Sequence, residues 1–402
     1  MASDLTGTPP VTRRRRDRKA QLAGLAADLF RRHGYHAVGI GDIAAAAGIT
    51  GPAVYRHFSS KRDILAHVLL TGVDALAARI TQILDQPGEP GRRLADLTQA
   101  LARLAVERRD AVALWRWLGR HLGRDQQLEV RRRGDAAITR WAEELRAHRG
   151  DLSPGDAELI CLAAMGVYGS PADYTVTLGK TRHARLLRRL ADAVLATRLP
   201  DIDPADASPS PSPGHFTSRR EVLLTEATRL FRQRGYRAVS MEDIGAAAGI
   251  AGPSIYRHFA SKADLMRAAA NRMVDRLTVD AARATAGAPT PIDALDRLID
   301  SYAETVLAHR DLMAVYVAEV ASLPAEDRAE LQRLQRGYVA EWVRLITAAN
   351  PDLESSEARV VAHAALTVGH DLARTGRVQS RPGLKAELAS LMREATSAAK
   401  PT

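Results

Sequence analysis

Apolar side chains recur along two stretches of the chain with the three- and four-residue spacing of an amphipathic helix. They stand at Leu22, Ala26, Leu29 and Phe30, and again at Leu223, Ala227, Leu230 and Phe231. The first series predicts a helix from about Asp17 to His33. Gly34 is expected to end it, because glycine accepts the left-handed conformation that follows many helices.

Glycine, proline and serine mark the helices that follow. A short helix is expected over residues 41–47, ended by Gly48. The next helix is expected to begin at Pro52, because proline lacks an N–H and the first N–H of a helix has no partner within the helix anyway. Ser60 then caps a longer helix, with Asp63 facing back in the capping-box arrangement. Two helices joined by a tight glycine turn, the second short and basic, predict a helix-turn-helix.

The whole pattern occurs twice. GPAVYRHFSSK at Gly51–Lys61 returns as GPSIYRHFASK at Gly252–Lys262, and Trp141 returns as Trp342, always 201 positions later. We therefore interpret the chain as a head-to-tail duplication. The copies are separated by LPDIDPADASPSPSPG, which is predicted to be extended because proline lacks the N–H and clashes with a preceding helical turn.

These signals predict an all-α fold of two tandem units, each a three-helix helix-turn-helix domain followed by a helical bundle. The predicted segments are a basic flexible arm (1–16), the first helix-turn-helix domain (17–65), the first helical bundle (66–199), a Pro/Ser linker (200–215), the second helix-turn-helix domain (216–266) and the second helical bundle (267–402).

Composition supports helices and a polyanionic partner. Hydrophobic residues make up 46% and aromatic residues only 4%, which favours helices over strands. The net charge is +10, as expected for a protein that binds nucleic acid. Cys161 is the one cysteine, so an internal disulfide and a cysteine-based zinc site are excluded and a cytoplasmic location fits. We expect no apolar run long enough to span a bilayer, and no signal-peptide core follows the basic run at 13–19.

The chemistry of the short basic helix suits DNA. Tyr55 and His57 can bond phosphate oxygens, Arg56 adds charge, and Lys61 sits at a helix N-terminus, which already favours an anion. The alternative is that the tyrosine and Phe58 are core aromatics and that the histidine caps a neighbour. Recurrence of all these residues in one register favours the DNA interpretation.

AVGIGDIAAAAGITGPAVYRHFSSKRDIL and AVSMEDIGAAAGIAGPSIYRHFASKADLM resemble the DNA-binding segment of TetR-family transcriptional regulators. The resemblance implies phosphate contacts by the Tyr, His and Lys positions and base contacts by the positions just before the Tyr. Gly39 stands where the family often has Thr or Ser, so a contact there is expected only at Ser240. The DNA-binding residues so predicted are Thr50, Gly51, Pro52, Ala53, Tyr55, Arg56, His57 and Lys61, with Ser240, Gly252, Pro253, Ser254, Tyr256, Arg257, His258 and Lys262.

The resemblance also implies that the remainder of each copy senses a ligand and dimerises, with the last two helices of each copy forming a four-helix interface. Residues that could line a ligand pocket are Trp115, Tyr168, Tyr302, Tyr316 and Tyr338, and core packing is the alternative for each. The segment AVYVAEVASLPAEDRAELQRLQRGYVAEWV resembles regulators that respond to lipid or acyl-CoA metabolites, which implies a small apolar effector. Copy one carries VRRRGD instead, which favours sensing by copy two alone.

Our first hypothesis is a cytoplasmic repressor that leaves double-stranded DNA when a small apolar molecule binds. Both half-site readers would lie on one chain as an intramolecular pseudo-dimer, reading a nearly palindromic operator with mild asymmetry. The alternatives are a dimer of two chains and a constitutive DNA-binding protein without ligand sensing. The chain contains no G-x-S-x-G, Walker or dinucleotide motif and no metal-ligand spacing of histidines, so we expect no enzyme activity, cofactor or metal.

Overall fold

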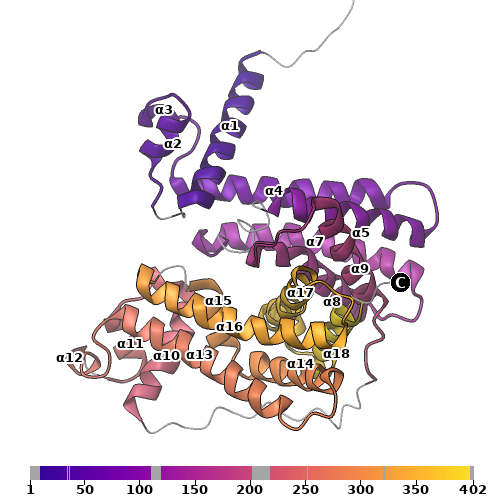
Figure 1. Ribbon diagram of the computed structural model, residues 1–402. Helices are drawn as coiled ribbons and strands as arrows, with labels where there is room; N and C mark the ends of the chain where they lie inside the picture. The colour runs from indigo at the N-terminus through magenta and orange to yellow at the C-terminus, as the bar shows by residue number, and fades with distance from the viewer. Residues whose placement is uncertain are drawn as a thin grey trace, which may run out of the picture. The chain divides into compact units, whose positions relative to one another are not determined.

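The computed structural model describes residues 10–33, 35, 37–109, 119–201, 218–250, 252–319 and 323–398, and every regular element in these ranges is helical (Figure 1). The helices of the first copy are α1 (Pro10–His33), α2 (Ile40–Ala46), α3 (Gly51–Tyr55), α4 (Lys61–Leu84), α5 (Pro90–Glu107), α7 (Arg124–His148), α8 (Pro154–Gly169) and α9 (Lys180–Ala196). Those of the second are α10 (Arg219–Arg234), α11 (Met241–Ala247), α12 (Gly252–Ile255), α13 (Lys262–Thr285), α14 (Pro291–Ala308), α15 (Arg310–Glu319), α16 (Ala325–Ala349), α17 (Ser355–Arg374) and α18 (Leu384–Ser397). The all-α prediction is confirmed.

Helix boundaries show that the duplication extends through both copies. The pairs α2 and α11, α4 and α13, α5 and α14, and α7 and α16 each begin and end 201 positions apart. This correspondence includes regions where the two sequences have little in common. The N-terminal caps of α4 and α13 are also repeated. The Ser60 side chain accepts a hydrogen bond from the Asp63 N–H, and the Ser261 side chain accepts one from the Asp264 N–H.

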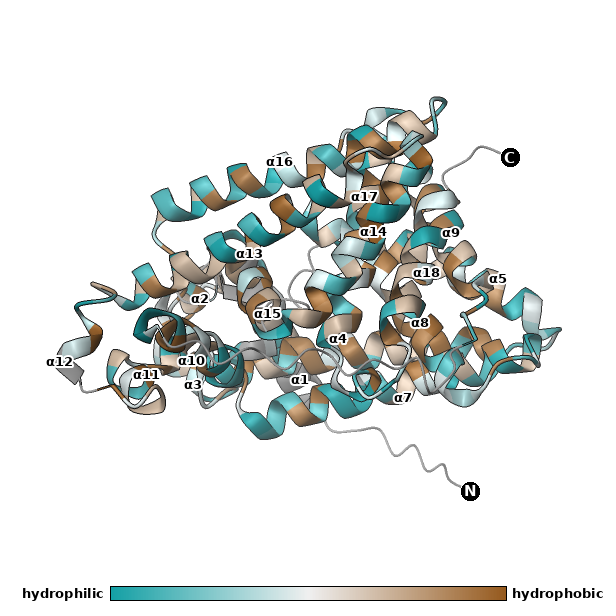
Figure 2. Cartoon of the chain, turned by 90° about the horizontal axis from the view of Figure 1, so that it is seen from below, coloured by the Kyte–Doolittle hydropathy of each residue, from teal (hydrophilic) through white to brown (hydrophobic). Residues whose placement is uncertain are grey.

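The chain divides into two compact units, residues 1–87 with 108–140, and residues 88–107 with 141–402. In the first unit, α1, α2, α3 and the start of α4 enclose a core that includes Leu22, Phe30, Ile43 and Ile64. In the second unit, amphipathic helices bury one face each. Figure 2 shows hydrophilic residues along α16 with hydrophobic ones between them, and Trp342 on this helix is fully buried.

Within the second unit, the last two helices of each copy pack together, with α8 against α17 and α9 against α18 (Figure 1). Gly166 makes the α8–α17 approach possible, because a Cβ there would lie 3.2 Å from the Cα of Val368. The four-helix packing expected for the ends of the two copies is therefore present inside one chain.

Ion pairs across this packing are reciprocal. Arg182 on α9 of the first copy binds Glu357 on α17 of the second copy at 2.9 Å. Arg381 of the second copy binds Asp156 on α8 of the first copy, and the position of Asp156 corresponds to that of Glu357. The two carboxylates thus occupy equivalent positions, whereas the arginines that bind them do not, since Arg381 corresponds to Lys180 and Arg182 to Gly383. Burial opposes ionisation of Asp156, but hydrogen bonds from Ser153 and Arg381 outweigh it and lower its pKa. At a pH above the ordinary carboxyl pKa, this ion pair therefore contributes its full stabilisation to the fold. That stabilisation is lost as the pH falls through the lowered pKa of Asp156.

The two copies fill their interiors with aromatic residues from different helices. In copy one the tyrosine comes from α8, where the Tyr168 hydroxyl donates to the Thr98 carbonyl at 3.3 Å. In copy two it comes from α14, where Tyr302 packs edge-on against Trp342 with ring centroids 5.7 Å apart. The position equivalent to Tyr168 is Gly369, and the position equivalent to Tyr302 is Leu101. A large residue on one helix is thus exchanged for a large residue on its neighbour.

Two expectations differ from the structure. Helix α1 begins at Pro10 rather than near Asp17, so the residues from Pro10 onward are helical rather than a flexible arm. Among the described helices, α4 is long and apolar enough to cross a membrane by length and composition, whereas no such run was expected. Its apolar residues Ile64, Leu65 and Leu69 belong to the helix-turn-helix core. The predicted linker (200–215) lies almost wholly outside the described residues.

The aromatic exchange predicts that Gly369→Ala destabilises the chain. The new Cβ would lie 2.6 Å from Cε1 of Tyr302, and overpacking of this kind costs about 1–3 kcal/mol, only partly offset by alanine's helix propensity of up to about 1 kcal/mol. We expect a lower thermal unfolding midpoint, and a smaller loss when Gly369→Ala is made in a Tyr302→Leu chain than in the wild-type chain. Gly337→Ala is the matched control, because its Cβ meets nothing within 4 Å, and it should stabilise slightly. Equal midpoints for the two alanine variants would contradict the packing.

Candidate nucleic-acid interface

Two helix-turn-helix units carry the candidate interface. We call α1–α3 with residues 61–69 head 1, and α10–α12 with residues 262–270 head 2. Gly48 and Gly249 both have φ +64, and the backbone N–H after each bonds back into the preceding helix, Ile49 to the Ala44 carbonyl and Ile250 to the Gly245 carbonyl. The predicted ends of both second helices are confirmed, and the turn aims the short helix in the same way in each head.

The short helices α3 and α12 have one buried and one exposed face. Val54 and Phe58 are buried in head 1, and Ile255 and Phe259 are buried in head 2. On the other face Tyr55 is 57% exposed and its counterpart Tyr256 is 50% exposed. The exposed tyrosines exclude the alternative in which they are core residues.

Lys61 and Lys262 are tied to their own heads. The Lys61 Nζ donates to the carbonyls of Tyr35 at 2.8 Å and Val38 at 2.7 Å, and lies 4.5 Å from the Tyr35 ring centroid. Lys262 repeats this with the Val239 carbonyl at 2.7 Å and the Tyr236 ring at 4.6 Å. Burial and the nearby Arg237 lower the pKa of Lys262. Each lysine therefore fastens the loop after the first helix to the start of α4 or α13, and a phosphate contact remains a prediction.

A second cation, which sequence reasoning missed, lies under each short helix. Lys19 lies 5.0 Å from the centroid of the Phe58 ring, and Arg220 lies 4.1 Å from that of Phe259. Arg220 also donates to the His258 carbonyl at 2.6 Å. The signal was available in the sequence, because both cations occupy the same register position in their copies.

The starts of the second helices differ as expected. In head 2 the Ser240 hydroxyl accepts from the Asp243 N–H at 3.0 Å, and the Asp243 carboxylate accepts from the Ser240 N–H at 2.8 Å. Those bonds from Ser240 lower the pKa of Asp243. Head 1 keeps only the second half of this box, with the Gly39 N–H donating to Asp42 at 2.7 Å. Ser240 is exposed, so its hydroxyl lies at the surface as the predicted contact requires.

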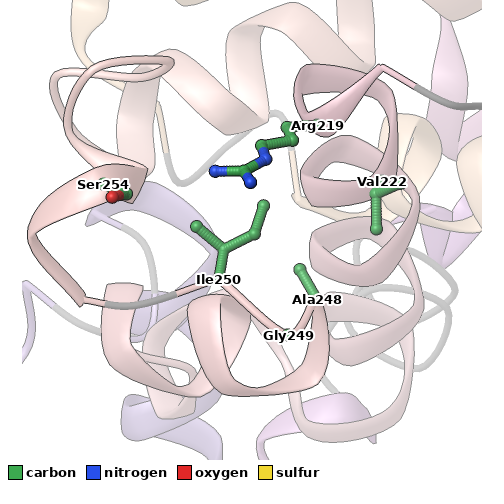
Figure 3. A pocket seen from close by; sticks show the side chains of 6 residues that line it. All are labelled: Arg219, Val222, Ala248, Gly249, Ile250 and Ser254. Carbon is green, nitrogen blue, oxygen red and sulfur yellow. The ribbon is translucent and has the colours of Figure 1, made fainter.

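Head 2 has a hollow of about 350 Å³ beside its short helix (Figure 3). It is lined by Arg219, Val222, Ala248, Gly249, Ile250 and Ser254. Figure 3 shows the Arg219 guanidinium pointing into the hollow from the start of α10. In head 1 the equivalent Arg18 bonds Gln21 at 2.8 Å, and Gln21 corresponds to Val222. The two equivalent arginines therefore have different neighbours, a glutamine in head 1 and a valine in head 2.

The other predicted contact residues also lie on or near the exposed face. In head 1, Thr50, Pro52 and Arg56 are exposed, and Gly51, Ala53, His57 and Lys61 are half-buried. In head 2, Arg257 is exposed, Ser254, His258 and Lys262 are half-buried, and Gly252 and Pro253 form the start of α12.

The candidate ligand residues lie inside the helical bundles. Tyr168, Tyr302 and Tyr316 are buried, and burial raises the pKa of each well above its ordinary value. Tyr338 stacks near Tyr302, with centroids 6.4 Å apart. Trp115 lies outside the described residues. No group of three or more His, Cys, Asp or Glu side chains arranged to hold a metal occurs within the described ranges.

Two helix-turn-helix heads with exposed tyrosines, each followed by a helical bundle, define a DNA-binding transcriptional regulator. The family model described as "Bacterial regulatory proteins, tetR family" matches twice, at residues 24–68 and 223–269. The model described as "Tetracyclin repressor-like, C-terminal domain" matches residues 288–374. The chain belongs to the TetR family and carries two copies of its DNA-binding domain.

Relatives include repressors and an activator. The transcriptional repressor KstR2 of Rhodococcus jostii is 31% identical over 148 residues, which cover 36% of this chain and 72% of that protein. The transcriptional activator FasR of Mycolicibacterium smegmatis is 37% identical over 86 residues, 21% of this chain and 39% of FasR. The chain thus spans well under two thirds of FasR. The solved structure of the ketosteroid regulator KstR2 of Mycobacterium tuberculosis aligns at 22% identity and a TM-score of 0.41, covering 47% of this chain and 98% of that one.

The lysine anchors predict that Lys61→Met loosens head 1. Methionine keeps the apolar stem but leaves the Tyr35 and Val38 carbonyls without their donor, which costs about 1–3 kcal/mol. Hydrogen exchange should show faster exchange in α2 and α3, while α11 and α12 serve as an internal control. Exposed Arg62→Ala should leave exchange unchanged. Unchanged exchange together with weaker DNA binding would assign Lys61 to the phosphate alone.

Proposed function

We propose that one chain binds DNA as an intramolecular pseudo-dimer, with head 1 on one half-site and head 2 on the other. The supporting observation is the reciprocal packing of α8 and α9 with α17 and α18, in which Arg182 meets Glu357 and Arg381 meets Asp156. A surface of this kind normally joins two chains. Here the chain occupies it with its own second copy, which leaves no need for a second chain.

Each head grips the duplex in the same way. The exposed Tyr55 and Tyr256, together with His57, His258, Lys61 and Lys262, bond phosphate oxygens, which fix the position of the head. The first residues of α3 and α12 face base edges in the major groove. Thr50, Gly51, Pro52 and Ala53 read one half-site, and Gly252, Pro253 and Ser254 read a closely similar one. The operator is therefore nearly palindromic, with half-sites about 34 Å or a multiple of it apart.

The bundles make the protein a ligand-released cytoplasmic repressor. Copy two supports this role best, because Tyr302, Tyr338 and Trp342 form a contiguous aromatic cluster within the segment that matches the C-terminal family model. Such a cluster suits a small apolar effector, lipid-like or acyl-CoA-like in character. The relatives include repressors by name, KstR2 among them.

The pseudo-dimer predicts a complex of one chain with one two-site duplex. The chain mass is 43.6 kDa, so light scattering should give that mass for the free protein and one chain per duplex in the complex. Footprinting should cover both half-sites, and Tyr55→Ala with His57→Ala should reduce the footprint to one. A free mass of two chains, or two chains per duplex, would favour the four-headed alternative.

Separating the copies tests the interface directly. Gly166→Val places a branched side chain where even a Cβ lies 3.2 Å from the Val368 backbone, so α8 and α17 are forced apart. We expect binding to a two-site duplex to weaken at least tenfold while binding to a single half-site changes little. Gly150→Ala is the control, since its Cβ meets nothing within 4 Å. Equal loss on both duplexes would indicate general unfolding.

Effector release separates a sensor from a constitutive DNA-binding protein. Purified protein on its selected operator should be challenged with a fatty acid, an acyl-CoA and a steroid, and DNA release followed by fluorescence anisotropy. An effector at one hundred times its Kd should also stabilise the free protein by about 2.7 kcal/mol. Tyr302→Leu should weaken release without altering affinity for DNA. Failure of every apolar compound to bind or release would support the constitutive alternative.

A further inference from the structure

The second helix of the helix-turn-helix begins differently in the two heads. Its second residue is Gly41 in head 1 and Glu242 in head 2, and both positions are exposed. Head 2 therefore has a carboxylate at a position where head 1 has no side chain at all. A negative charge is unexpected on the face of a domain that binds a polyanion.

The carboxylate lies beside the exposed tyrosine of the short helix. The Tyr256 hydroxyl is 3.5 Å from Oε1 of Glu242, a long contact that joins α11 to the end of α12. A phosphate oxygen that accepted a hydrogen bond from this hydroxyl would lie about 6 Å or less from the carboxylate, a distance at which two like charges repel measurably.

No cation in the described part of head 2 forms an ion pair with Glu242. Arg234 is directed at the neighbouring Asp243, at 3.7 Å, and Asp243 itself caps α11 through Ser240. The charge of Glu242 therefore remains directed at whatever approaches Tyr256. Head 1 has a more positive first helix, because α1 is 24 residues long and includes the basic run Arg13–Lys19. The first helix of head 2, α10, has only 16 residues.

We propose that Glu242 weakens the hold of head 2 on the DNA backbone, so that head 1 is the dominant reader and head 2 the subordinate one. This rests on the proposed function, since it assumes that both heads engage one duplex. The Tyr256 hydroxyl is shared between the carboxylate and the phosphate, and the carboxylate repels the same phosphate. Tyr55 has neither constraint, because the position equivalent to Glu242 is Gly41, which has no side chain.

The experiment uses the full chain and two duplexes, one selected from a pool with two randomised half-sites and one of unrelated sequence and equal length. Glu242→Gln keeps the size and removes the charge. It should tighten binding to both duplexes roughly three- to tenfold at about 0.1 M salt, and the slope of log affinity against log salt should steepen by up to about 0.9. Gly41→Glu transfers the charge to head 1 and should weaken both by a similar factor.

A double-mutant cycle tests the coupling to the tyrosine. Tyr256→Phe should reduce affinity little in the wild-type chain and several-fold more in the Glu242→Gln chain, whereas Tyr55→Phe should have its full effect in either. Thermal unfolding checks that each variant is folded. Unchanged affinity of Glu242→Gln at every salt concentration overturns the proposal. So does a loss confined to the selected duplex, which would assign Glu242 to a base. If the wild-type chain binds neither duplex, the proposed function fails first.

Discussion

The close approach of α8 and α17 is the contact on which the rest of the structure depends. Gly166 allows the two backbones to meet, and ion pairs link each of these helices to the other copy, Glu357 of α17 to Arg182 of α9 and Asp156 of α8 to Arg381 just before α18. The buried helices at this seam contribute the dominant, non-directional part of the stability, while the ion pairs select one alignment among many similar ones. In the proposed pseudo-dimer both partners belong to one chain, so their association would not depend on protein concentration, unlike that of a dimer of separate chains.

Covalent linkage also removes a constraint that a symmetric dimer cannot escape. In a homodimer every substitution appears twice and must suit both sides of the axis, whereas here each copy changes alone. The interiors show the result, because copy one has Tyr168 on α8 and Leu101 on α5, whereas the equivalent positions in copy two hold Gly369 and Tyr302. The two helix-turn-helix heads show it too, in the exchange of Gln21 for Val222 and in the different starts of the second helices. The fold is the same in both copies, while residues at equivalent positions differ.

What the sequence predicted well is local in origin. Gly48, Pro52 and Ser60 set helix ends through the backbone conformations and hydrogen bonds available to those residue types, so the helix-turn-helix and its repeat were readable directly. The contacts that the sequence could not predict join residues that are far apart along the chain. The Lys61 ammonium meets the carbonyls of Tyr35 and Val38, a contact created only by folding, and nothing in the residue type distinguishes that role from a phosphate contact. The exchange of tyrosines between α8 and α14 likewise appears only when two helices are packed together.

A tether gives an unequal pair of heads a property that an equal pair lacks. In the proposed pseudo-dimer, head 2 would face its half-site at an effective concentration on the order of 1 mM once head 1 had bound. A head with a dissociation constant of about 1 mM is then engaged half of the time, and a tenfold tighter one about nine-tenths of the time. Occupancy is most sensitive to small changes in this range and nearly insensitive when both heads bind tightly. If head 2 is the weaker head, as proposed, it is the natural point of control. A slight displacement of its bundle, or a single charge at its surface, would then change occupancy of its half-site more than a comparable change in head 1 would change occupancy of the other half-site.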